Sequence, residues 1–381
     1  MLTALALGAC SSVPLHTPPR ASTPAPVTPP KPSQAVNAPE KVDLPPDALL
    51  QGKSRWLPVE WQELPGYTGD LLTQWWPAWL RSCDKPAPAF ASACQRARSL
   101  GQPTEQGIRD FVQAQFKPYR VESIQGETQG LLTGYFEPLL EASRTPRPGF
   151  QVAVHMPPSD LGSRKPYFTR QELETLPAGK AALKGREIAY LSDPLDLLLL
   201  QIQGSGRVWL QEPSGRKQWV RLAFAGHNDQ PFKSSARWLV DQGEITLDQA
   251  SWPALRAWAK ANPRRVNELM WANPRVVFFK EEPLLARDSE AGPKGAQGVP
   301  LTAGRSIAVD RDSIPYGTPV WLDSIQPLTG EPLQRAVMAQ DTGSAIVGAV
   351  RADYFAGTGE DALALAGRMK QPLRLWVLWP R

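Results

Sequence analysis

Cysteine and histidine are scarce in this sequence, with three residues of each among 381. The histidines, His16, His155 and His227, are scattered without the spacing of metal ligands, so no metal site is expected. No run of lysine or arginine exceeds two residues, and no zinc-finger or RNA-binding motif occurs. The sequence therefore implies no metal or organic cofactor and no nucleic-acid partner. Its mild net charge of +5 suits another anionic polymer, such as an acidic polysaccharide or cell wall.

The sequence also lacks the second half of an aspartic protease site. Such a site needs two aspartates that share a proton, with an Asp-Thr-Gly loop from each half. The chain has one Asp-Thr-Gly, at Asp341, and is far longer than the small subunit of a homodimeric protease. Gln340 precedes Asp341 where that motif has an apolar residue. These features argue against a protease.

Two glycine-containing loops lack the motifs that would make them catalytic. The sequence GSG at 204–206 has no Gly-Lys-Ser/Thr ending of a phosphate loop, and no Gly-x-Ser-x-Gly elbow surrounds Ser205. It is better interpreted as a turn whose amides, with Gln201 or Gln203, could face a polar ligand. The sequence GHND at 226–229 could be a general-base loop, although a turn that uses Asn-Asp is the more common outcome.

The first residues predict a lipid anchor. A short apolar run ends in LGAC at 7–10, which fits a bacterial lipobox whose cysteine is lipidated after cleavage. Only nine residues, none of them basic, precede Cys10, so 1–10 is interpreted as a truncated lipoprotein signal; a chance cysteine is the alternative. Residues 11–47 are rich in proline, serine, threonine and alanine, which predicts a disordered tether.

The other two cysteines, Cys83 and Cys94, lie eleven residues apart. In a reducing cytosol they would be two ordinary thiols, whereas an oxidising periplasm would allow them to close one small loop. One lipidated cysteine plus one pair accounts for all three cysteines. We therefore predict a disulfide between Cys83 and Cys94.

The spacing of apolar residues divides the rest of the chain into four stretches. Residues 48–118 predict mainly helices, and 119–225 predict short strands separated by glycine, proline and serine turns. Helices return at 233–272, where Thr246 or Asp248 is expected to cap a helix. Strand-like alternation resumes with PRVVFF and continues to the end, and no repeat of fixed period is evident.

Two carboxylates in MAQDTGSAIVGAVRADYF suit the cleavage of a glycosidic bond. That reaction needs a carboxylic acid that protonates the leaving oxygen, and a neighbouring charge or an apolar wall can raise its pKa. Asp341 ends a strand-like run, Gly343 and Gly348 clear space for a substrate, and Asp353 follows twelve residues after Asp341. A loop of that length could return Asp353 beside Asp341. The alternative is that Asp341 caps a turn and Asp353 caps the helix near EDALALAGRM.

Six separate segments, in order, resemble the membrane-bound lytic murein transglycosylase A (MltA) family of Gram-negative bacteria. They are LLTGYFEPLLEASR (131–144), DLLLLQIQGSGRV (196–208), ANPRVVFF (272–279), GVPLTAGRSIAVDRDSIPYGTPVWLD (298–323), AQDTGSAIVGAVRADYFAGTGEDA (339–362) and LRLWVLWP (373–380). Each segment alone is modest evidence, but their order and joint presence are specific. The resemblance implies features of fold and chemistry that composition and spacing do not supply.

The fold implied by this resemblance is mainly β with some helices. A double-psi β-barrel catalytic domain would comprise residues 48–138 plus 284–381, with a second β-rich, substrate-binding domain inserted at 139–283. A groove between the two domains would hold a glycan strand. The family's location implies the Gram-negative periplasm, with a lipid anchor in the outer membrane. Peptidoglycan glycan strands are the implied partner, and proteins of cell-wall synthesis or division are further candidates.

The implied reaction is cleavage of the β-1,4 bond between N-acetylmuramic acid and N-acetylglucosamine without water, which leaves a 1,6-anhydro end. One acid protonates the departing oxygen and, as a carboxylate, then takes the proton of the 6-hydroxyl. The nucleophile belongs to the same sugar and gains from proximity, so no second carboxylate is compulsory. The second aspartate of the C-terminal motif is the family's acid, here Asp353. The first is Asp341, which is expected to support the acid or orient the sugar.

The resemblance has departures and leaves two alternatives open. Related barrels often carry His-Phe before the acid, where this chain has Arg351 and Ala352. A hydrolase on the same barrel, with Asp341 activating water, would release reducing ends. An expansin-like wall-binding protein without catalysis would release nothing.

The resemblance also implies which side chains line the groove. The family's Thr-Gly-Tyr-Tyr-x-Pro segment matches residues 133–138, with Phe136 in place of the second tyrosine. Arg351 is expected to hold Asp353 or the lactyl group of the muramoyl residue. The other expected groove residues are Thr133, Gly134, Tyr135, Glu137, Gln203, Gly204 and Ser205.

Overall fold

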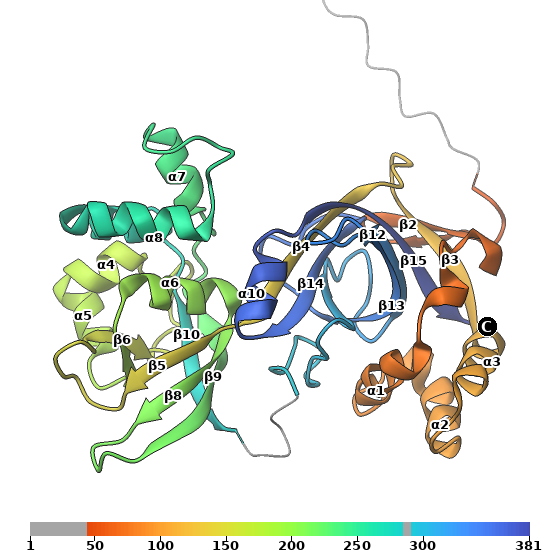
Figure 1. The fold of residues 1–381 in the computed structure, drawn as a ribbon, viewed down its shortest axis with the longest axis horizontal. Helices are drawn as coiled ribbons and strands as arrows, with labels where there is room; N and C mark the ends of the chain where they lie inside the picture. The colour runs from red at the N-terminus through yellow and green to blue at the C-terminus, as the bar shows by residue number, and fades with distance from the viewer. Residues whose placement is uncertain (1–43, 285–290) are drawn as a thin grey trace, which may run out of the picture. The chain divides into compact units, whose positions relative to one another are not determined.

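Six strands of the larger β-sheet close into a barrel (Figure 1). The computed structural model describes residues 44–284 and 291–381, in which the strands of this sheet follow the order β1-β2-β3-β15-β12-β13-β11-β14-β4. Because β15 pairs with both β12 and β4, the ring β15-β12-β13-β11-β14-β4 is closed. The strands are β1 (Leu49–Gln51), β2 (Ser54–Pro58), β3 (Phe116–Ser123), β4 (Gly130–Glu137), β11 (Ser306–Val309), β12 (Pro319–Ile325), β13 (Pro332–Asp341), β14 (Arg351–Thr358) and β15 (Lys370–Pro380).

The second sheet is built from the middle of the chain. Its strand order is β10-β9-β8-β5-β7-β6, and β5 begins two residues after β4 ends, so the chain passes directly from the barrel into this sheet. The strands are β5 (Leu139–Ser143), β6 (Val152–His155), β7 (Glu187–Leu191), β8 (Ser205–Gln211), β9 (Lys217–His227) and β10 (Val277–Pro283).

Short helices accompany both sheets. Before β3 the described chain has α1 (Leu72–Ser82), α2 (Ala91–Ser99) and α3 (Glu105–Gln115), with the 3-10 turns η1 (Trp61–Glu63), η2 (Tyr67–Gly69) and η3 (Pro88–Phe90). Between β6 and β10 it has α4 (Arg170–Thr175), α5 (Pro177–Leu183), α6 (Pro194–Gln203), α7 (Ser235–Asp241), α8 (Trp252–Ala261), η4 (Pro263–Arg265) and α9 (Val266–Trp271). The last helix, α10 (Glu360–Ala366), lies between β14 and β15.

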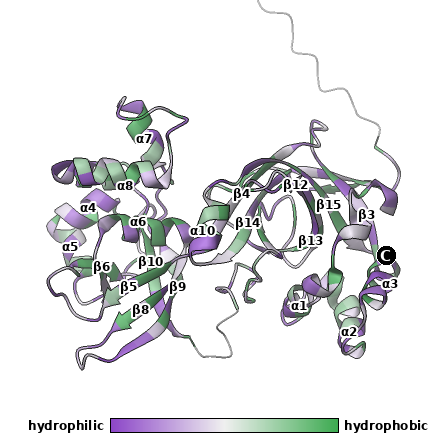
Figure 2. Cartoon of the chain, viewed as in Figure 1, coloured by the Kyte–Doolittle hydropathy of each residue, from purple (hydrophilic) through white to green (hydrophobic). Residues whose placement is uncertain are grey.

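Apolar side chains fill the inside of each sheet assembly, and Figure 2 shows hydrophobic residues along the strands of both sheets. Aliphatic residues of the barrel strands, such as Ile307, Val320 and Val337, form one buried cluster. A second cluster is aromatic: Trp75 and Trp79 of α1 are completely buried, and their rings stack 5.8 Å apart. Burial of these large rings holds the N-terminal helices against the barrel.

Cys83 and Cys94 lie inside the same aromatic cluster. Their sulfur atoms are bonded at 2.02 Å as a disulfide, which joins the end of α1 to α2. Both residues are buried. Cys10, the lipobox and residues 11–43 of the expected tether lie outside the described residues.

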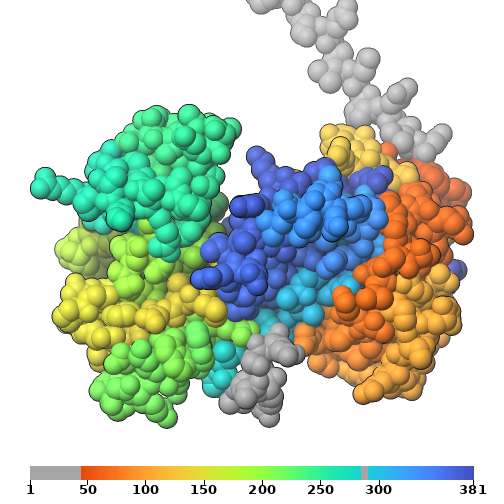
Figure 3. Space-filling view, viewed as in Figure 1, coloured from red at the N-terminus to blue at the C-terminus, as the bar shows by residue number. Residues whose placement is uncertain are grey.

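The two sheets are joined by packing as well as by the chain. Leu199 of α6 is buried together with Phe136 of β4 and with Ala362 and Ala366 of α10. In Figure 3 the blue surface of the C-terminal residues meets the green surface of the middle of the chain. A glycine at position 134 lets α10 pack closely on β4, since a Cβ there would lie 2.8 Å from the Cα of Ala366.

The prediction of a mainly β fold with some helices is confirmed, and the stretch 48–118 is mainly helical as predicted, with α1, α2 and α3. It also holds the short strands β1 and β2, of which β1 pairs with β2 and β2 with β3. Two local expectations are wrong. The stretch 119–225 holds the helices α4, α5 and α6 as well as strands, and α6 has leucines buried on several sides, so it shows no amphipathic period. Ser251 caps α8 through its hydroxyl, because the helix starts later than Thr246 or Asp248. The double-psi crossing and the domain boundaries stay predictions.

Candidate active site

Two aspartates flank a single alanine on the barrel. Ala308 of β11 pairs with Asp341 of β13 on one side and with Asp353 of β14 on the other. Paired residues of neighbouring strands point to the same face, so only the methyl group of Ala308 lies between the two carboxyl groups. Two strand spacings place the two backbones about 9.5 Å apart. The expectation that Asp353 returns beside Asp341 is thus met by strand pairing.

The alternative interpretation, in which both aspartates cap local elements, is wrong for Asp353 and partly correct for Asp341. Asp353 lies within β14, and the residue that precedes α10 is Gly359, whose backbone has a left-handed φ of 88°. Asp341 is the last residue of β13, and its Oδ1 accepts a hydrogen bond from the backbone N–H of Ala296 at 3.0 Å. It therefore anchors a neighbouring loop and still faces the site.

Thr133 and Arg351 surround the carboxyl group of Asp353. The hydroxyl of Thr133, which is opposite Asp353 in the β4–β14 pair, donates to its Oδ1 at 2.6 Å. The same hydroxyl accepts a hydrogen bond from Nη2 of Arg351 at 2.8 Å. Arg351 thus reaches Asp353 through Thr133, and its other nitrogen donates to the backbone oxygen of Leu131.

Burial raises the pKa of Asp353 to about 6. The Thr133 hydrogen bond and the positive charge of Arg351 lower that pKa, and the negative charge of Asp341 raises it, but burial has the largest effect. A carboxyl group with this pKa keeps a useful fraction of its protons near neutral pH. It can therefore give a proton and take one back, as a general acid and base must.

Asp341 is held by a neutral hydroxyl group. The phenol of Tyr135 donates to its Oδ2 at 2.8 Å, and the ring of Tyr135 packs against Phe355 with centroids 5.3 Å apart. Burial and the charge of Asp341 raise the pKa of Tyr135 well above its ordinary value, so the phenol remains a donor. Burial also raises the pKa of Asp341 itself.

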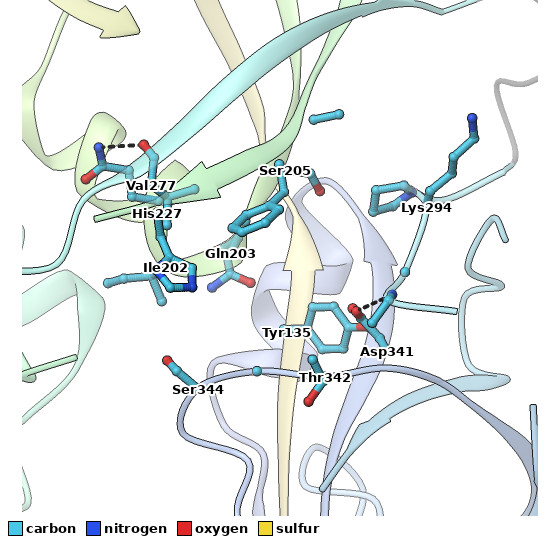
Figure 4. Close-up of a pocket in the computed structure, with 18 of the residues that line it drawn as sticks. Tyr135, Ile202, Gln203, Ser205, His227, Val277, Lys294, Asp341, Thr342 and Ser344 are labelled. Atoms are coloured by element: carbon cyan, nitrogen blue, oxygen red, sulfur yellow. Dashed lines mark hydrogen bonds between the residues drawn. The ribbon is translucent and has the colours of Figure 1, made fainter. Parts of the chain in front are cut away.

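A cavity of about 640 Å³ opens beside Asp341 (Figure 4). Its walls come from α6, β9 and β10 on one side, and from the loops around Ala296 and Thr342 on the other. Asp353 is not among the residues that line it; Asp353 lies two strands from Asp341, on the other side of Ala308. The expected groove residues that line the cavity are Tyr135, Gln203, Gly204, Ser205 and Asp341.

The end of α6 positions three of these residues. Gly204 ends the helix with a left-handed φ of 80°, and Ser205 starts β8 directly afterwards. Oε1 of Gln203 accepts the backbone N–H of Phe136 at 2.9 Å, so its amide nitrogen keeps its donors for the cavity. Gln201 also lines the cavity, but its amide is already engaged: its oxygen accepts from Arg170, and its nitrogen donates to the backbone oxygen of Val277.

Glu137 and Gly134 do not line the groove as expected. The side chain of Glu137 is completely buried, and it accepts hydrogen bonds from Nε of Arg207 at 2.7 Å and Nε of Arg221 at 2.5 Å. These two arginines belong to β8 and β9, so the ion pairs tie the barrel strand β4 to the second sheet. Gly134 is required for close packing against Ala366.

Sequence reasoning missed several parts of the site. Ala308 gives no signal in RSIAVD, since its role depends on pairing with two strands from later in the chain. Phe224 and His227 of β9 line the cavity, and only the GHND loop hinted at the second. Within 44–284 and 291–381, no three His, Cys, Asp or Glu side chains gather as a metal site. In the same residues, no helix has the length and apolarity to span a membrane.

Two family models match the chain. The "MltA specific insert domain" matches residues 131–280, and the "3D domain" matches residues 305–379. The first match covers β4 from its second residue and the second sheet as far as Lys280 of β10, and the second match contains both aspartates.

Curated relatives carry the same family name. Membrane-bound lytic murein transglycosylase A of Escherichia coli K12 is 32% identical over 253 residues, which are 65% of this chain and 64% of that protein. The chain thus spans just under two thirds of the E. coli relative. The Vibrio cholerae protein of that name is 31% identical over 274 residues, 70% of either chain.

Solved structures resemble this one over most of its length. Lytic transglycosylase LtgG of Burkholderia pseudomallei is 43% identical, with 86% of this chain and 95% of that chain covered and a TM-score of 0.59. MltA from Neisseria gonorrhoeae is 28% identical, with 87% and 94% covered and a TM-score of 0.74. E. coli MltA with bound chitohexaose is 25% identical, with 81% and 89% covered and a TM-score of 0.63. The chain belongs to the membrane-bound lytic murein transglycosylase A family.

Proposed function

We propose that this protein is a lytic transglycosylase of peptidoglycan, with Asp353 as acid and then base. The proton of Asp353 passes to the oxygen that leaves C1 of the muramoyl residue, and the C1–O bond breaks. The 6-hydroxyl oxygen of the same residue bonds to C1 and gives its proton to the Asp353 carboxylate, which restores the acid. The observation that carries this proposal is the half-buried Asp353 with a pKa of about 6, held by the Thr133 hydroxyl.

The relatives support this reaction. Those reported above are named lytic transglycosylases, and the E. coli structure has chitohexaose bound, which is a chain of N-acetylated sugars. In this chain the cavity at Asp341 would hold the glycan, with Tyr135, Gln203, Gly204 and Ser205 at its wall. Asp341 would orient a sugar, since two fixed donors hold its carboxyl group.

One observation favours hydrolysis as a second candidate. Inverting glycosidases separate their two carboxyl groups by about 6.5–9.5 Å so that a water fits between sugar and base. The strands that carry Asp341 and Asp353 lie two strand spacings apart, about 9.5 Å between backbones, with Ala308 of β11 between them; this favours carboxyl groups wider apart than the about 5–5.5 Å of a retaining glycosidase. In the inverting mechanism Asp341 would activate the water.

The place of action is part of the proposal. A lipidated Cys10 and the proline-rich segment that follows it would hold the folded residues at the outer membrane, within reach of the murein. The barrel (48–138 plus 284–381) would carry the acid, and the inserted domain (139–283) would hold the glycan. Partners in cell-wall synthesis or division stay a prediction.

The product mass tests the proposal. Full-length protein is incubated with purified murein sacculi, and the soluble fragments are analysed by mass spectrometry. Fragments with 1,6-anhydromuramoyl ends support the transglycosylase. Reducing ends, one water heavier, overturn it in favour of hydrolysis. Protein that pellets with the sacculi and releases nothing also overturns it and favours the wall-binding alternative.

The same assay separates the two aspartates. Under the transglycosylase proposal Asp341→Asn reduces the rate but still yields anhydro ends, because no second carboxylate is compulsory. A variant that is completely inactive while Asp353→Asn remains active would show that the two roles are exchanged.

A further inference from the structure

The loop that binds Asp341 lies directly against the end of β13. The backbone N–H of Ala296 donates to Oδ1 of Asp341 at 3.0 Å (Figure 4). The residue before it is Gly295, where a Cβ would lie 2.5 Å from the backbone oxygen of Gln340. The backbone N–H of Gln297 donates to that same oxygen at 3.0 Å. Three consecutive residues thus fix this loop on the strand that carries Asp341.

The side chains of Gln297 and Gln340 both reach the last turn of α1. The amide oxygen of Gln297 accepts from the hydroxyl of Ser82 at 3.0 Å, and its nitrogen donates to the backbone oxygens of Ser82 and Lys85. The nitrogen of Gln340 donates to the Ser82 hydroxyl at 2.7 Å. Ser82 is therefore a shared partner of the residue that precedes Asp341 and of the loop that binds it.

These contacts form behind the cavity and not in it. Ser82 and Gln340 are buried, and neither they nor Gln297 line the cavity, so their side chains do not face a ligand there. Gln340 occupies the position where an aspartic protease motif has an apolar residue. A buried amide that loses its partners costs free energy, so the two glutamines and Ser82 hold one another in place.

The disulfide fixes the turn that contains Ser82. Cys83 follows Ser82 directly and is bonded to Cys94 of α2, with the two Cα atoms 5.3 Å apart. Arg98, one helical turn further along α2, donates to the backbone oxygen of Cys83. A covalent link of this length limits how far the turn can move from α2. The position of Ser82, and with it that of the loop, therefore depends on the disulfide.

We propose that Gln297 is a positioning residue for Asp341, and that the disulfide supports it. The disulfide holds Ser82, Ser82 holds Gln297, and the loop then presents the N–H of Ala296 to the carboxylate. Without these contacts the loop can leave β13, and the carboxylate loses a fixed donor. Because Asp341 is taken to orient a sugar, the consequence for turnover rests on the proposed function.

The titration of Asp341 tests the positioning role without any use of turnover. Burial raises the pKa of Asp341, and hydrogen bonds from Tyr135 and from the backbone N–H groups of Thr342 and Ala296 lower it. Gln297→Met keeps the length of the side chain and removes its amide, so loss of the Ala296 donor should shift the pKa of Asp341 further upward. Carbon-detected NMR of the carboxyl groups in the full chain measures this shift, and Asp341→Asn assigns the resonance.

A matched control separates this shift from a general loss of stability. Thr104 caps α3, in the same helical part of the chain, through a bond from the N–H of Gly107. Thr104→Ala should lower the Tm and leave the titration of Asp341 unchanged. Loss of the disulfide by Cys83→Ser with Cys94→Ser should shift the pKa of Asp341 upward.

Combining the disulfide change with Gln297→Met tests whether the two act in one chain of contacts. The combined variant should shift the pKa of Asp341 no further than the larger single effect. Shifts that add would overturn the route through Gln297. A folded disulfide variant with the parent's titration would overturn the supporting role of the disulfide, and Gln297→Met tests the rest if that variant does not fold.

Turnover shows whether Gln297 acts through Asp341. Gln297→Met should lower kcat/KM for solubilised glycan strands about 3- to 10-fold, the worth of one hydrogen bond. In an Asp341→Ala background the same change should have no further effect, because the group that it positions is gone. An equal loss with and without Asp341 would overturn the inference, and so would an unchanged titration of Asp341 in Gln297→Met.

The two readouts separate this inference from the proposed function. If the parent releases no fragments from sacculi while the titration of Asp341 still responds to Gln297→Met, the proposed function fails and the positioning role stands. If the parent releases anhydro fragments and the titration does not respond, the positioning role fails and the proposed function stands.

Discussion

The carboxyl groups on the barrel and the carboxyl group at the junction of the two sheets have different donors around them. Asp353 and Asp341 accept hydrogen bonds from a threonine, a tyrosine and a backbone amide, all uncharged. Glu137, on the same strand β4 as Thr133, is clamped by the guanidinium groups of Arg207 and Arg221.

This difference distinguishes a carboxyl group that can exchange its proton from one that stabilises the fold. Neutral donors do not compensate a buried negative charge fully, so burial raises the pKa of Asp353 to about 6 and its proton can be exchanged. Two guanidinium groups more than offset the single negative charge of Glu137 and donate to both of its oxygens, so that side chain holds two sheets together. On β4, only four residues thus separate Thr133, the donor that holds the acid, from Glu137 and its structural ion pairs.

The largest expected effect is the loss of the acid. Asp353→Asn should lower the release of soluble fragments from sacculi about 10²- to 10⁴-fold, because an amide cannot give or take the proton. The fold should persist, since an amide still accepts from Thr133, and murein pelleting should be normal. Asp361→Asn on the exposed start of α10 is the control. Activity of Asp353→Asn within a factor of two of the parent would remove Asp353 from its role.

The next effect concerns stability, and it tests the structural half of the comparison. Glu137→Ala removes the carboxylate that accepts from the buried guanidinium group of Arg221, so it should lower the free energy of unfolding by about 3–5 kcal/mol. Urea denaturation measures it. Glu141→Ala, on the neighbouring strand β5 and exposed, should change little. A loss below 1 kcal/mol for Glu137→Ala would mean that the ion pairs do not hold the sheets together.

The pH dependence of the rate tests the catalytic side of this comparison, the role of Asp353 as the acid. Asp353 is active in its protonated form. Nearly all of the enzyme is therefore in the active form well below the pKa of about 6, and that fraction falls as the pH rises through this value. Above it, kcat/KM should fall about tenfold per pH unit, since it reports the free enzyme's ionisation. The same raised pKa means that protonated Asp353 contributes stability at low pH, which is also lost as pH rises through about 6. A flat rate profile between pH 5 and 8 would contradict the assignment.

The smallest effect removes one neutral donor. The Thr133 hydrogen bond lowers the pKa of Asp353, so Thr133→Val should raise that pKa and move the fall in kcat/KM to higher pH. One hydrogen bond is worth about 1 kcal/mol, which corresponds to less than about one pH unit. Thr329→Val, exposed after β12, is the control. A shift to lower pH would mean that the hydroxyl of Thr133 acts on Asp353 in another way.

Much of this site was predictable because it is local in sequence. Strand-like alternation identified β13, and the family motif marked Asp341 and Asp353. The assignment of Glu137 to the groove failed because its neighbours Thr133 and Tyr135 do face the site, while its own partners, Arg207 and Arg221, come from strands about 70 and 84 residues away. No sequence pattern near Glu137 predicts that Arg207 and Arg221 are its partners.

The sequence by itself determined which segments alternate as strands, that two cysteines have the spacing for a loop, and which motif holds the two aspartates. Each of these follows from residues close in the chain. Only the tertiary structure decided that β11 lies between β13 and β14, so that Ala308 alone separates Asp341 from Asp353. It also decided which carboxyl groups accept hydrogen bonds from neutral donors and which accept them directly from arginines. Protonation depends on those distant neighbours, because the electrostatic cost of burial is set by whatever the fold brings into contact.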